Sequence, residues 1–395
     1  MRKGKVGLAV LFGGIAAGLI AITIHHLSRG LPLGTDSAVY RAGGLALLHG
    51  EPLYDPLLAL APPDRAALPF TYPPFAALLF VPLAVVPPQI AWLFVAMGSV
   101  PALAAVVHRF AGSLPPVVLC LLPVLEPVWR LLSLGQINAV LMALVVTDVL
   151  PARRPRWGGV LVGLAAAVKL TPLIFVPHLF LTGRRADGVR ALAVFCGASA
   201  LGAVVLPRDS LRYWTSAVVD NHNAGSIDWV LDQSLHGLLV RSGMPSIGWY
   251  AAGTALILAV AAVLVRDFHR RGDARAALLV SAGCALLISP LSWTHHWIWV
   301  VPLAACLAGR RAALAGVAAV FTGRTLTWVP EGAHRELTWN LPQALLGNAY
   351  VLAALAAGAV LGLRLSRRGR IPRRPDPGDQ GNTPHLYGEG ALPAR

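Results

Sequence analysis

One carboxylate, Asp36, stands shortly after the first apolar run of the chain, which ends near Ile24. It occurs in the stretch Gly34–Tyr40, and many further apolar runs follow it. A carboxylate just outside a bilayer can act as a general base toward a hydroxyl group. Its position therefore indicates chemistry rather than permeation alone. Aspartate is also a preferred helix cap, so Asp36 could cap a short helix that starts at Ser37, and the two roles can coexist.

Further polar residues stand in stretches that we assign, from the topology below, to the same side of the membrane as Asp36. Ionisable and amide groups at the lipid boundary are costly, so their convergence on one face predicts a functional site. The loop 220–223 belongs to this face as well. The candidate site residues besides Asp36 are Tyr40, Tyr72, Arg130, Gln136, Asn138, Lys169, Gln233, Ser234, His236, His295 and His296.

These residue types fit one reaction, the transfer of a sugar from a polyprenyl phosphate to a hydroxyl group. The lipid tail of such a donor lies in the bilayer, its phosphate lies at the outer interface, and the acceptor approaches from outside. An inverting displacement needs one general base, here Asp36, which can contribute about 10²- to 10⁴-fold in rate. The departing phosphate needs positive charge and hydrogen-bond donors rather than an acid. The available groups are Lys169, Arg130, His295 and His296.

The composition defines the class of protein. Of the 395 residues, 56% are hydrophobic and only 13% are charged, and the mean hydropathy is +0.64. Water-soluble globular proteins of this length do not have such a composition, so we expect a polytopic membrane protein. The net charge of +15 comes from short basic clusters between apolar runs, which the positive-inside rule explains without a nucleic-acid partner. The four cysteines lie within apolar runs and are expected to be small buried side chains.

Hydropathy predicts an all-α polytopic fold with about twelve transmembrane helices. Placing the basic clusters in the cytoplasm puts both termini there and leaves two long external loops, at about 25–74 and 207–246. We expect one transmembrane domain over residues 1–365, followed by a polar tail, 366–395, that is disordered because it is rich in proline and glycine. The apolar segments lie at about 6–24, 75–86, 90–107, 114–128, 136–150, 157–182, 189–206, 247–265, 274–291, 295–309, 311–329 and 341–363.

Two of these segments do not fit a simple crossing. Segment 75–86 lies between proline pairs and is too short for a hydrocarbon core that needs about 20 helical residues, so it is expected in the outer interface. Segment 157–182 has basic groups at both ends and is interrupted by Lys169–Pro172. Because proline breaks the helical hydrogen-bond ladder and a lysine needs a polar environment, we predict a hairpin of two short helices with Lys169 at its outer tip.

The order and spacing of several short motifs resemble glycosyltransferase family 87, a polyprenyl-phosphate-dependent family of the GT-C superfamily. The resemblance covers about residues 30–300, and each motif alone is short. One departure is Asp232, where the family pattern leads us to expect asparagine. The matching pieces are Asp36 with Tyr40, Thr71–Pro74, Gly135–Asn138, Lys169 with Pro172, Gln233–Gly237 and Ser289–His296.

The resemblance implies a GT-C fold and an inverting transferase in the plasma membrane, with its active site on the extracytoplasmic side. The donor would be polyprenyl-phosphate mannose or, in some members, the arabinofuranose analogue, and α-(1→2) mannosyl transfer is the commoner activity. The acceptor would be a lipid-linked glycan of an actinobacterial envelope, such as a phosphatidylinositol mannoside or lipomannan. Neither a cofactor nor a metal is expected.

The resemblance also implies roles for individual residues. Asp36 would be the base, and His295 and His296 would serve the donor phosphate or the acceptor. From the residues themselves we assign the remaining donor contacts to Lys169, Arg130, Gln136 and Asn138, and the acceptor or loop contacts to Tyr40, Tyr72, Gln233, Ser234 and His236. The departure at Asp232 puts acceptor contacts by its loop in doubt.

Each of these side chains also has a structural interpretation. The histidine pair could belong to an interfacial aromatic belt, and Lys169 could extend from a helix end toward the interface. Gln136 and Asn138 could form hydrogen bonds between helices, and Glu126 is best explained as an ion-pair partner of Arg130. A metal site is not expected, because adjacent histidines on a helix point about 100° apart.

Two other classes of function compete with a transferase. A flippase or carrier for the same kind of lipid would also have many spans and buried polar groups. Transporters tend to contain internal repeats and helices broken at the membrane midplane, whereas this sequence has no visible repeat and its polar residues gather on one face. A noncatalytic scaffold for envelope assembly would require that Asp36 be dispensable.

Overall fold

The computed structural model describes residues 14, 17–26, 28–30, 33–54, 58–59, 67–112, 122–151, 156–219 and 225–368. Most of the predicted first helix, 6–24, lies outside the described residues. The same holds for the loop 220–223 and for the tail from residue 369 onward. The expectations for these segments stay predictions.

Helices make up almost all of the described chain. The α-helices are α2 (Thr35–His49), α3 (Pro74–Ala84), α4 (Pro88–Ala111), α6 (Glu126–Leu134), α7 (Asn138–Val149), α8 (Val160–Val168), α9 (Phe175–Leu181), α10 (Arg185–Val205), α11 (Pro207–Arg212), α12 (Leu235–Arg241), α13 (Ile247–Arg270), α14 (Ala274–Ile288), α15 (Val300–Cys306), α16 (Arg311–Phe321), α17 (Leu341–Gly347) and α18 (Ala349–Arg368). The 3-10 turns are η1 (Leu122–Val124), η2 (Thr171–Ile174), η4 (Thr294–Trp299), η5 (Thr325–Trp328) and η6 (Arg335–Thr338), and η3 (Tyr213–Ala217) is a π-helix. Two-residue strands β1 (Leu58–Ala59) and β2 (Ala67–Leu68) pair antiparallel.

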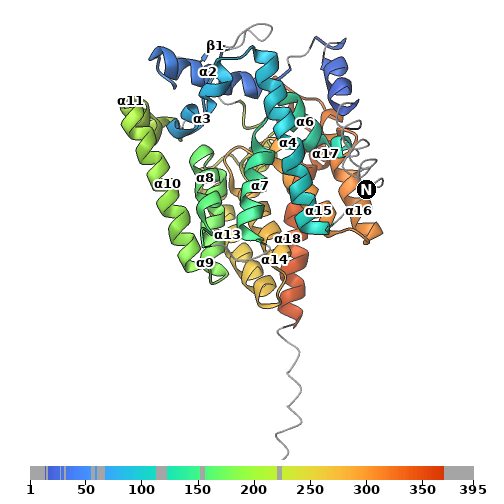
Figure 1. Ribbon diagram of the computed structural model, residues 1–395. Coiled ribbons are helices and arrows are strands. Elements are labelled where there is room, and N and C mark those ends of the chain that lie inside the picture. Colours follow the sequence, from blue (N-terminus) through green and yellow to red (C-terminus); the bar gives the residue numbers. More distant parts are fainter. Residues whose placement is uncertain are drawn as a thin grey trace, which may run out of the picture.

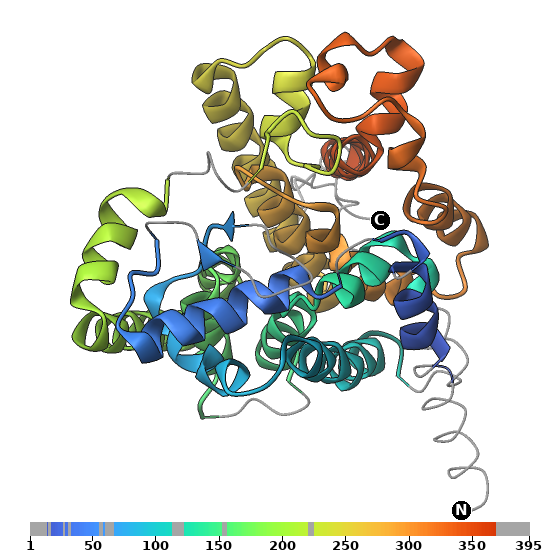
Figure 2. The same ribbon diagram turned by 90° about the horizontal axis from the view of Figure 1, so that it is seen from above.

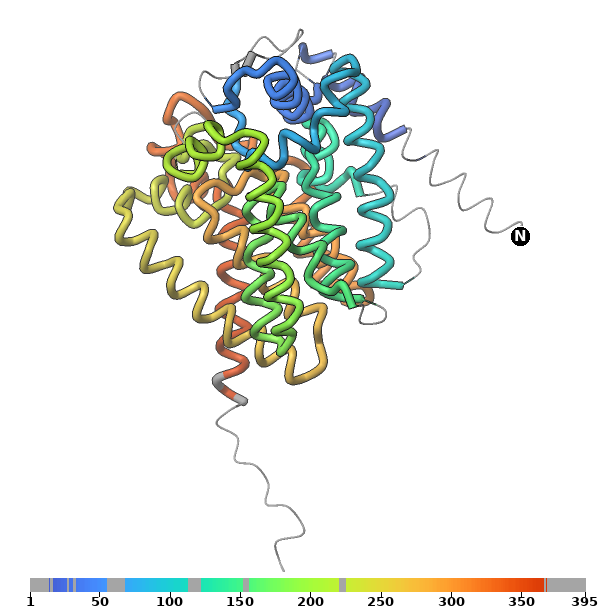
Figure 3. The backbone as a smooth tube through the Cα atoms, turned by 60° about the vertical axis from the view of Figure 1, so that its left-hand side comes forward, coloured from blue at the N-terminus to red at the C-terminus, as the bar shows by residue number. Residues whose placement is uncertain are grey.

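The longer helices run side by side along one axis, and shorter elements cover one end of this bundle (Figure 1). From above, α2 lies across that end rather than along the axis (Figure 2). In Figure 3 the blue amino-terminal elements and the yellow-green region around α11 lie at the same end. The covered end therefore brings together segments that are far apart in the sequence.

Among the described residues, fewer helices are long and apolar enough to span a membrane than the twelve crossings that the sequence predicts. Within the described residues, α4, α10 and α13 are long and apolar enough to cross alone. The pairs α6–α7 and α17–α18, bent by 116° and 79°, raise the number to five if each pair is one span. The predicted all-helical membrane fold is confirmed, but the twelve crossings and two long loops are not. Helices occupy much of both predicted loops, namely α2 in the first and α11, η3 and α12 in the second.

Segment 157–182 folds back on itself, as the sequence predicts. At its beginning, a Cβ on Gly159 would lie only 2.0 Å from the carbonyl oxygen of Asp187, just after its end. Arg184 donates to the carbonyl oxygens of Asp148 (3.0 Å) and Val149 (2.9 Å), which tie the base of this hairpin to α7. Lys169 leaves the helical conformation with φ −150° and ψ 134°, and it forms the tip between α8 and η2.

Segment 75–86 forms α3, which at 11 residues is too short to span a bilayer. Pro74 occupies its first turn, where the missing N–H costs nothing. The helix packs so closely on α2 that a Cβ on Gly44 would lie 2.8 Å from the carbonyl oxygen of Phe80. Its position in the outer interface stays a prediction.

A buried aromatic cluster holds α2 in place at the covered end of the bundle. Tyr40 stacks on Phe80 with ring centroids 4.4 Å apart, and Tyr72 meets Tyr40 edge to face at 5.2 Å. Phe70 packs so closely on α2 that a Cβ on Gly43 would lie 2.4 Å from its ring. These contacts fix the rotation of α2 and therefore the direction in which its first turn presents Asp36.

Candidate active site

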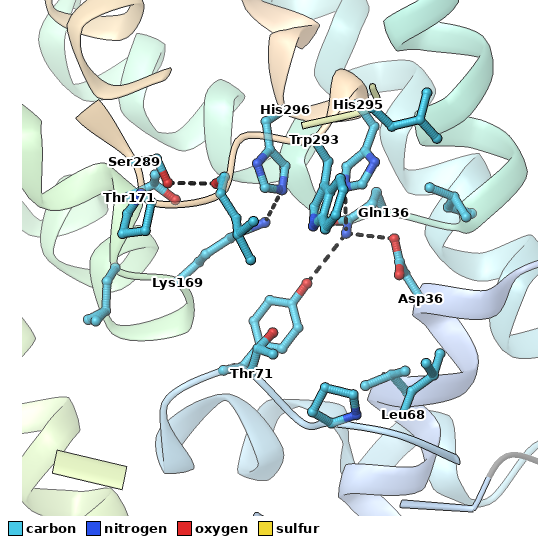
Figure 4. A pocket seen from close by; sticks show the side chains of 18 of the residues that line it. Asp36, Leu68, Thr71, Gln136, Lys169, Thr171, Ser289, Trp293, His295 and His296 are labelled. Carbon is cyan, nitrogen blue, oxygen red and sulfur yellow. Dashed lines mark hydrogen bonds between the residues drawn. The ribbon is translucent and has the colours of Figure 1, made fainter. Parts of the chain in front are cut away.

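A cavity of about 420 Å³ opens beneath the covered end, and residues from seven separate parts of the chain line it (Figure 4). Eight of the twelve predicted site residues line it, whereas Asn138, Gln233, Ser234 and His236 do not. The eight are Asp36, Tyr40, Tyr72, Arg130, Gln136, Lys169, His295 and His296. The structure thus brings together the aspartate and the histidine pair, although 259 positions separate Asp36 from His295 in the sequence.

Asp36 lies in the first turn of α2 and does not cap that helix. The helix begins at Thr35 with Gly34 as its N-cap, so a cap by Asp36 on a helix starting at Ser37 is wrong. The left-handed conformation of Gly34 (φ 79°) and its closeness to Trp92 leave no room for a side chain, because a Cβ would lie 2.8 Å from that residue. Asp36 Oδ2 accepts a hydrogen bond of 2.7 Å from Gln136 Nε2.

Burial raises the pKa of Asp36 to about 6, while the Gln136 hydrogen bond and the charges of Lys169 and Arg130 act in the opposite direction. The carboxyl group therefore ionises close to neutral pH. A base with a pKa near the working pH combines sufficient basicity with a large deprotonated fraction.

Gln136 connects the groups around Asp36. It follows Gly135, whose left-handed conformation (φ 66°) ends α6 and turns the chain into α7. Its Nε2 lies 3.3 Å from His295 Nε2, and its Oε1 accepts from Tyr40 OH at 2.9 Å. Tyr40 OH in turn lies 3.1 Å from Tyr72 OH. The amide thus holds Asp36 and His295 on the same side of the cavity.

Lys169, at the tip of the hairpin, lies on the side of the cavity opposite Asp36 (Figure 4). Its Nζ donates to Asn138 Oδ1 at 3.0 Å and lies 3.1 Å from His296 Nε2. The ammonium group also lies 5.6 Å from the centre of the Tyr72 ring. An ammonium group has three N–H donors and accepts none. His296 Nε2 is therefore the acceptor when Lys169 is charged. Since the described residues provide these two acceptors, one N–H donor stays available for an anion in the cavity.

The two adjacent histidines point in different directions. Their rings stand at 87° to each other with centroids 4.6 Å apart. His295 contacts Gln136, and His296 contacts Lys169. Within the described residues, no group of three or more His, Cys, Asp or Glu side chains is arranged to hold a metal ion.

Arg130 adds positive charge to the cavity wall, and Glu126 anchors it from behind. Arg130 Nε lies 3.7 Å from Glu126 Oε1. The same carboxylate accepts from Thr294 Oγ1 and from Tyr350 OH, each at 3.0 Å. Glu126 thus joins α6 to α18 and to the segment that carries the histidines, which supports its structural interpretation.

The loop residues predicted to contact the acceptor have structural partners instead. Gln233 is fully buried and its Nε2 donates to the carbonyl oxygens of Val230 and Gly347, each at 2.7 Å. Ser234 is the N-cap of α12 and is also fully buried. His236 packs against Tyr250 in a tilted arrangement, with ring centroids 4.8 Å apart. The motif containing them therefore shapes the loop without reaching the cavity.

Sequence reasoning did not select Tyr213 and Trp229, which line the cavity. Tyr213 begins the π-helix η3, a rare element that occurs often at functional sites. Trp229 follows the loop 220–223, and no motif surrounds it. Interfacial tryptophans are common in membrane proteins, so its residue type alone does not indicate a site.

Comparison with known proteins identifies the family of the chain. The sequence model of glycosyltransferase family 87 matches residues 70–290, which is more than half of the chain. The chain belongs to glycosyltransferase family 87. Asp36, His295 and His296 lie outside the matched residues. In the structure they line the same cavity as residues inside the match.

Named relatives extend the similarity to most of the chain. A Mycobacterium tuberculosis protein named polyprenol-phosphate-mannose-dependent alpha-(1-2)-phosphatidylinositol mannoside mannosyltransferase is 33% identical over 91% of this chain and 90% of its own length. The protein of the same name from Mycolicibacterium smegmatis is 33% identical over 89% and 88%. A Mycobacterium tuberculosis enzyme whose name specifies a phosphatidylinositol pentamannoside is 33% identical over 68% and 64%. No solved structure matches the chain.

Proposed function

We propose that this family 87 glycosyltransferase moves mannose from polyprenyl-phosphate mannose to a phosphatidylinositol mannoside or a similar lipid-linked glycan. The transfer inverts the anomeric centre and forms an α-(1→2) bond at the extracytoplasmic face of the plasma membrane, in which the chain is a multi-pass protein. The observation that carries this proposal is the shared cavity, in which a carboxylate of raised pKa faces a lysine and two histidines. The names of the relatives support mannose as the sugar and phosphatidylinositol mannosides as acceptors.

Asp36 is the general base in this reaction. It takes the proton of the acceptor hydroxyl as that oxygen attacks the anomeric carbon of the donor from the side opposite the phosphate. The bond from the anomeric carbon to the acceptor oxygen forms while the bond to the phosphate oxygen breaks. Gln136 orients the carboxylate through its 2.7 Å hydrogen bond, so that the second carboxylate oxygen can face the acceptor.

The other end of the cavity receives the negative charge of the leaving phosphate. Lys169 supplies an ammonium donor that Asn138 and His296 already orient. Arg130 adds a second cation on the wall. Fixed donors of this kind stabilise the charge that develops in the transition state, and the donors themselves need not reorganise to do so. Since the polyprenyl phosphate leaves as a stable anion, no acid is required.

The test uses protein reconstituted in proteoliposomes with radiolabelled polyprenyl-phosphate mannose and glycolipid acceptor. We expect the wild-type protein to incorporate label into glycolipid, and we expect Asp36→Asn to lose this activity. Asp267→Asn is the matched control, because Asp267 pairs with Arg271 and does not line the cavity. Equal incorporation by wild type and Asp36→Asn would overturn the assignment of the base, and labelled arabinose donor in place of mannose tests the sugar.

A further inference from the structure

Two tryptophans, Trp229 and Trp293, form an aromatic corner in the cavity that the proposed reaction does not use. Their rings meet edge to face at an angle of 67°, with centroids 5.6 Å apart. Trp293 extends into the space between the side chains of His296 and Gln136 (Figure 4). Trp229 is 36% exposed and lies toward the rim. The corner therefore leads from the reacting groups to the mouth of the cavity.

The backbone beneath this corner is held in place by paired segments. Asp232 and Trp293 form an antiparallel bridge, and Thr294 N donates to the carbonyl oxygen of Leu231 at 3.0 Å. Arg241, which is buried, donates to the carbonyl oxygen of Trp229 at 3.0 Å. The fold consequently fixes the backbone positions of the two tryptophans relative to each other.

Glycine completes the support of Trp293. A Cβ on Gly225 would lie 2.7 Å from the indole ring, and the φ of this glycine is +125°, which side chains rarely adopt. The backbone therefore packs directly on one part of the ring. The part that faces the cavity stays open to a ligand.

The surroundings of Trp229 favour a polar ligand over an isoprenoid. Its indole Nε1 donates to Glu331 Oε2 at 3.3 Å. Next to it in the chain, Asp228 Oδ2 lies 2.8 Å from His334 Nδ1. An isoprenoid tail over this rim would remove ionisable groups from water without giving them new partners, which is unfavourable. A sugar would keep them hydrogen-bonded through its hydroxyl groups.

We propose that this aromatic corner is the acceptor-glycan subsite of the transferase, with Trp293 against the sugar that receives mannose and Trp229 against the next sugar of the acceptor. This inference rests on the proposed function. A pyranose ring presents an apolar C–H face, which an indole ring can cover, and its hydroxyl edges stay free for hydrogen bonds. Apolar aromatic walls with a few polar groups are the usual construction of small-ligand sites. The order of the two rings places the reacting sugar nearer to Asp36.

The test compares two soluble acceptors, methyl α-mannoside and methyl α-dimannoside, with detergent-solubilised protein and radiolabelled polyprenyl-phosphate mannose. For wild-type protein we expect the KM of the dimannoside to be about tenfold lower, because its second ring gains a stacking contact. Trp229→Ala should remove this difference while leaving the KM of the donor unchanged. Trp293→Ala should raise the KM of both acceptors by about tenfold.

Two further variants separate binding from folding. Trp229→Phe keeps a flat ring and should retain most of the dimannoside advantage even if Trp229→Ala lowers the thermal unfolding midpoint. Trp249→Ala is the matched control, because Trp249 is 60% exposed on α13 and does not line the cavity. Equal KM values for the two acceptors in wild type, or a dimannoside advantage that persists in Trp229→Ala, would overturn the subsite. Absence of label in every acceptor, glycolipid included, would instead refute the proposed function.

Discussion

Asp36 lies across the cavity from the tip of the 157–182 hairpin, and Asp148 lies at the base of the hairpin. The surroundings of the two carboxylates differ sharply. Asp148 is completely buried at the base, where its carboxylate accepts from Gly159 N at 2.6 Å and Val162 N at 3.0 Å. Arg184 Nη2 lies 3.7 Å from the same carboxylate. Asp36 faces the cavity that is also lined by Lys169, at the tip of the hairpin. Among the described residues, Gln136 is the one side chain that donates a hydrogen bond to Asp36.

The comparison separates a structural carboxylate from a reactive one. Fixed backbone N–H groups and an arginine occupy the oxygens of Asp148, so that side chain is bound on every side by the protein. Asp36 keeps acceptor capacity directed at a cavity, and burial outweighs the stabilisation that Gln136, Lys169 and Arg130 give its charge. Buried polar groups that lack full satisfaction are costly, and they persist mainly where function requires them.

The largest effect that tests this contrast is the loss of catalysis in Asp36→Asn. The amide cannot take a proton, so we expect kcat to fall by about 10²- to 10⁴-fold. Stability should not fall at pH 7. A folded-state pKa raised above the unfolded value contributes stability at low pH, and that contribution is lost as pH rises through about 6. Thermal unfolding in detergent checks this, and a large drop in the midpoint would mean that Asp36 is structural.

Asp148→Ala should show the opposite pattern. It leaves two backbone N–H groups and the Arg184 guanidinium without their carboxylate, and breaking a buried charge pair costs about 3–5 kcal/mol. We expect a clearly lower unfolding midpoint, whereas the activity of the molecules that stay folded falls much less than in Asp36→Asn. If Asp148→Ala were as stable as wild type, the hairpin base would not depend on this carboxylate.

The sequence predicts part of this contrast and misses the rest, for physical reasons. The hairpin and its lysine tip are predictable because Pro172 and the length of the segment are local signals. The count of twelve crossings is not confirmed, because hydropathy cannot tell a straight span from a helix pair bent at Gly135. The contacts of Gln233 could not be predicted, since a buried amide can satisfy itself with backbone groups brought near only by folding.

Lys169→Met tests the cationic side of the cavity at intermediate magnitude. Methionine keeps the length of the side chain and removes the charge, and a hydrogen bond to a charged group contributes about 1.5–3 kcal/mol. We expect the KM of the polyprenyl-phosphate donor to rise by about 10- to 100-fold. The KM of the acceptor should stay the same, because the proposed acceptor subsite is the Trp229–Trp293 corner. An acceptor effect as large as the donor effect would contradict this division of the cavity.

The smallest effect concerns pH. Because burial raises the pKa of Asp36 to about 6, kcat/KM should decrease below that pH as the base becomes protonated. The hydrogen bond from Gln136 favours the charged carboxylate, so Gln136→Leu should raise the pKa of Asp36 and move the acidic limb upward by about one unit. The measurement is a pH–rate profile of both proteins between pH 4.5 and 8.5. Were the limb unmoved in Gln136→Leu, the group that titrates in the profile would not be Asp36, and the base would have to be sought elsewhere in the cavity.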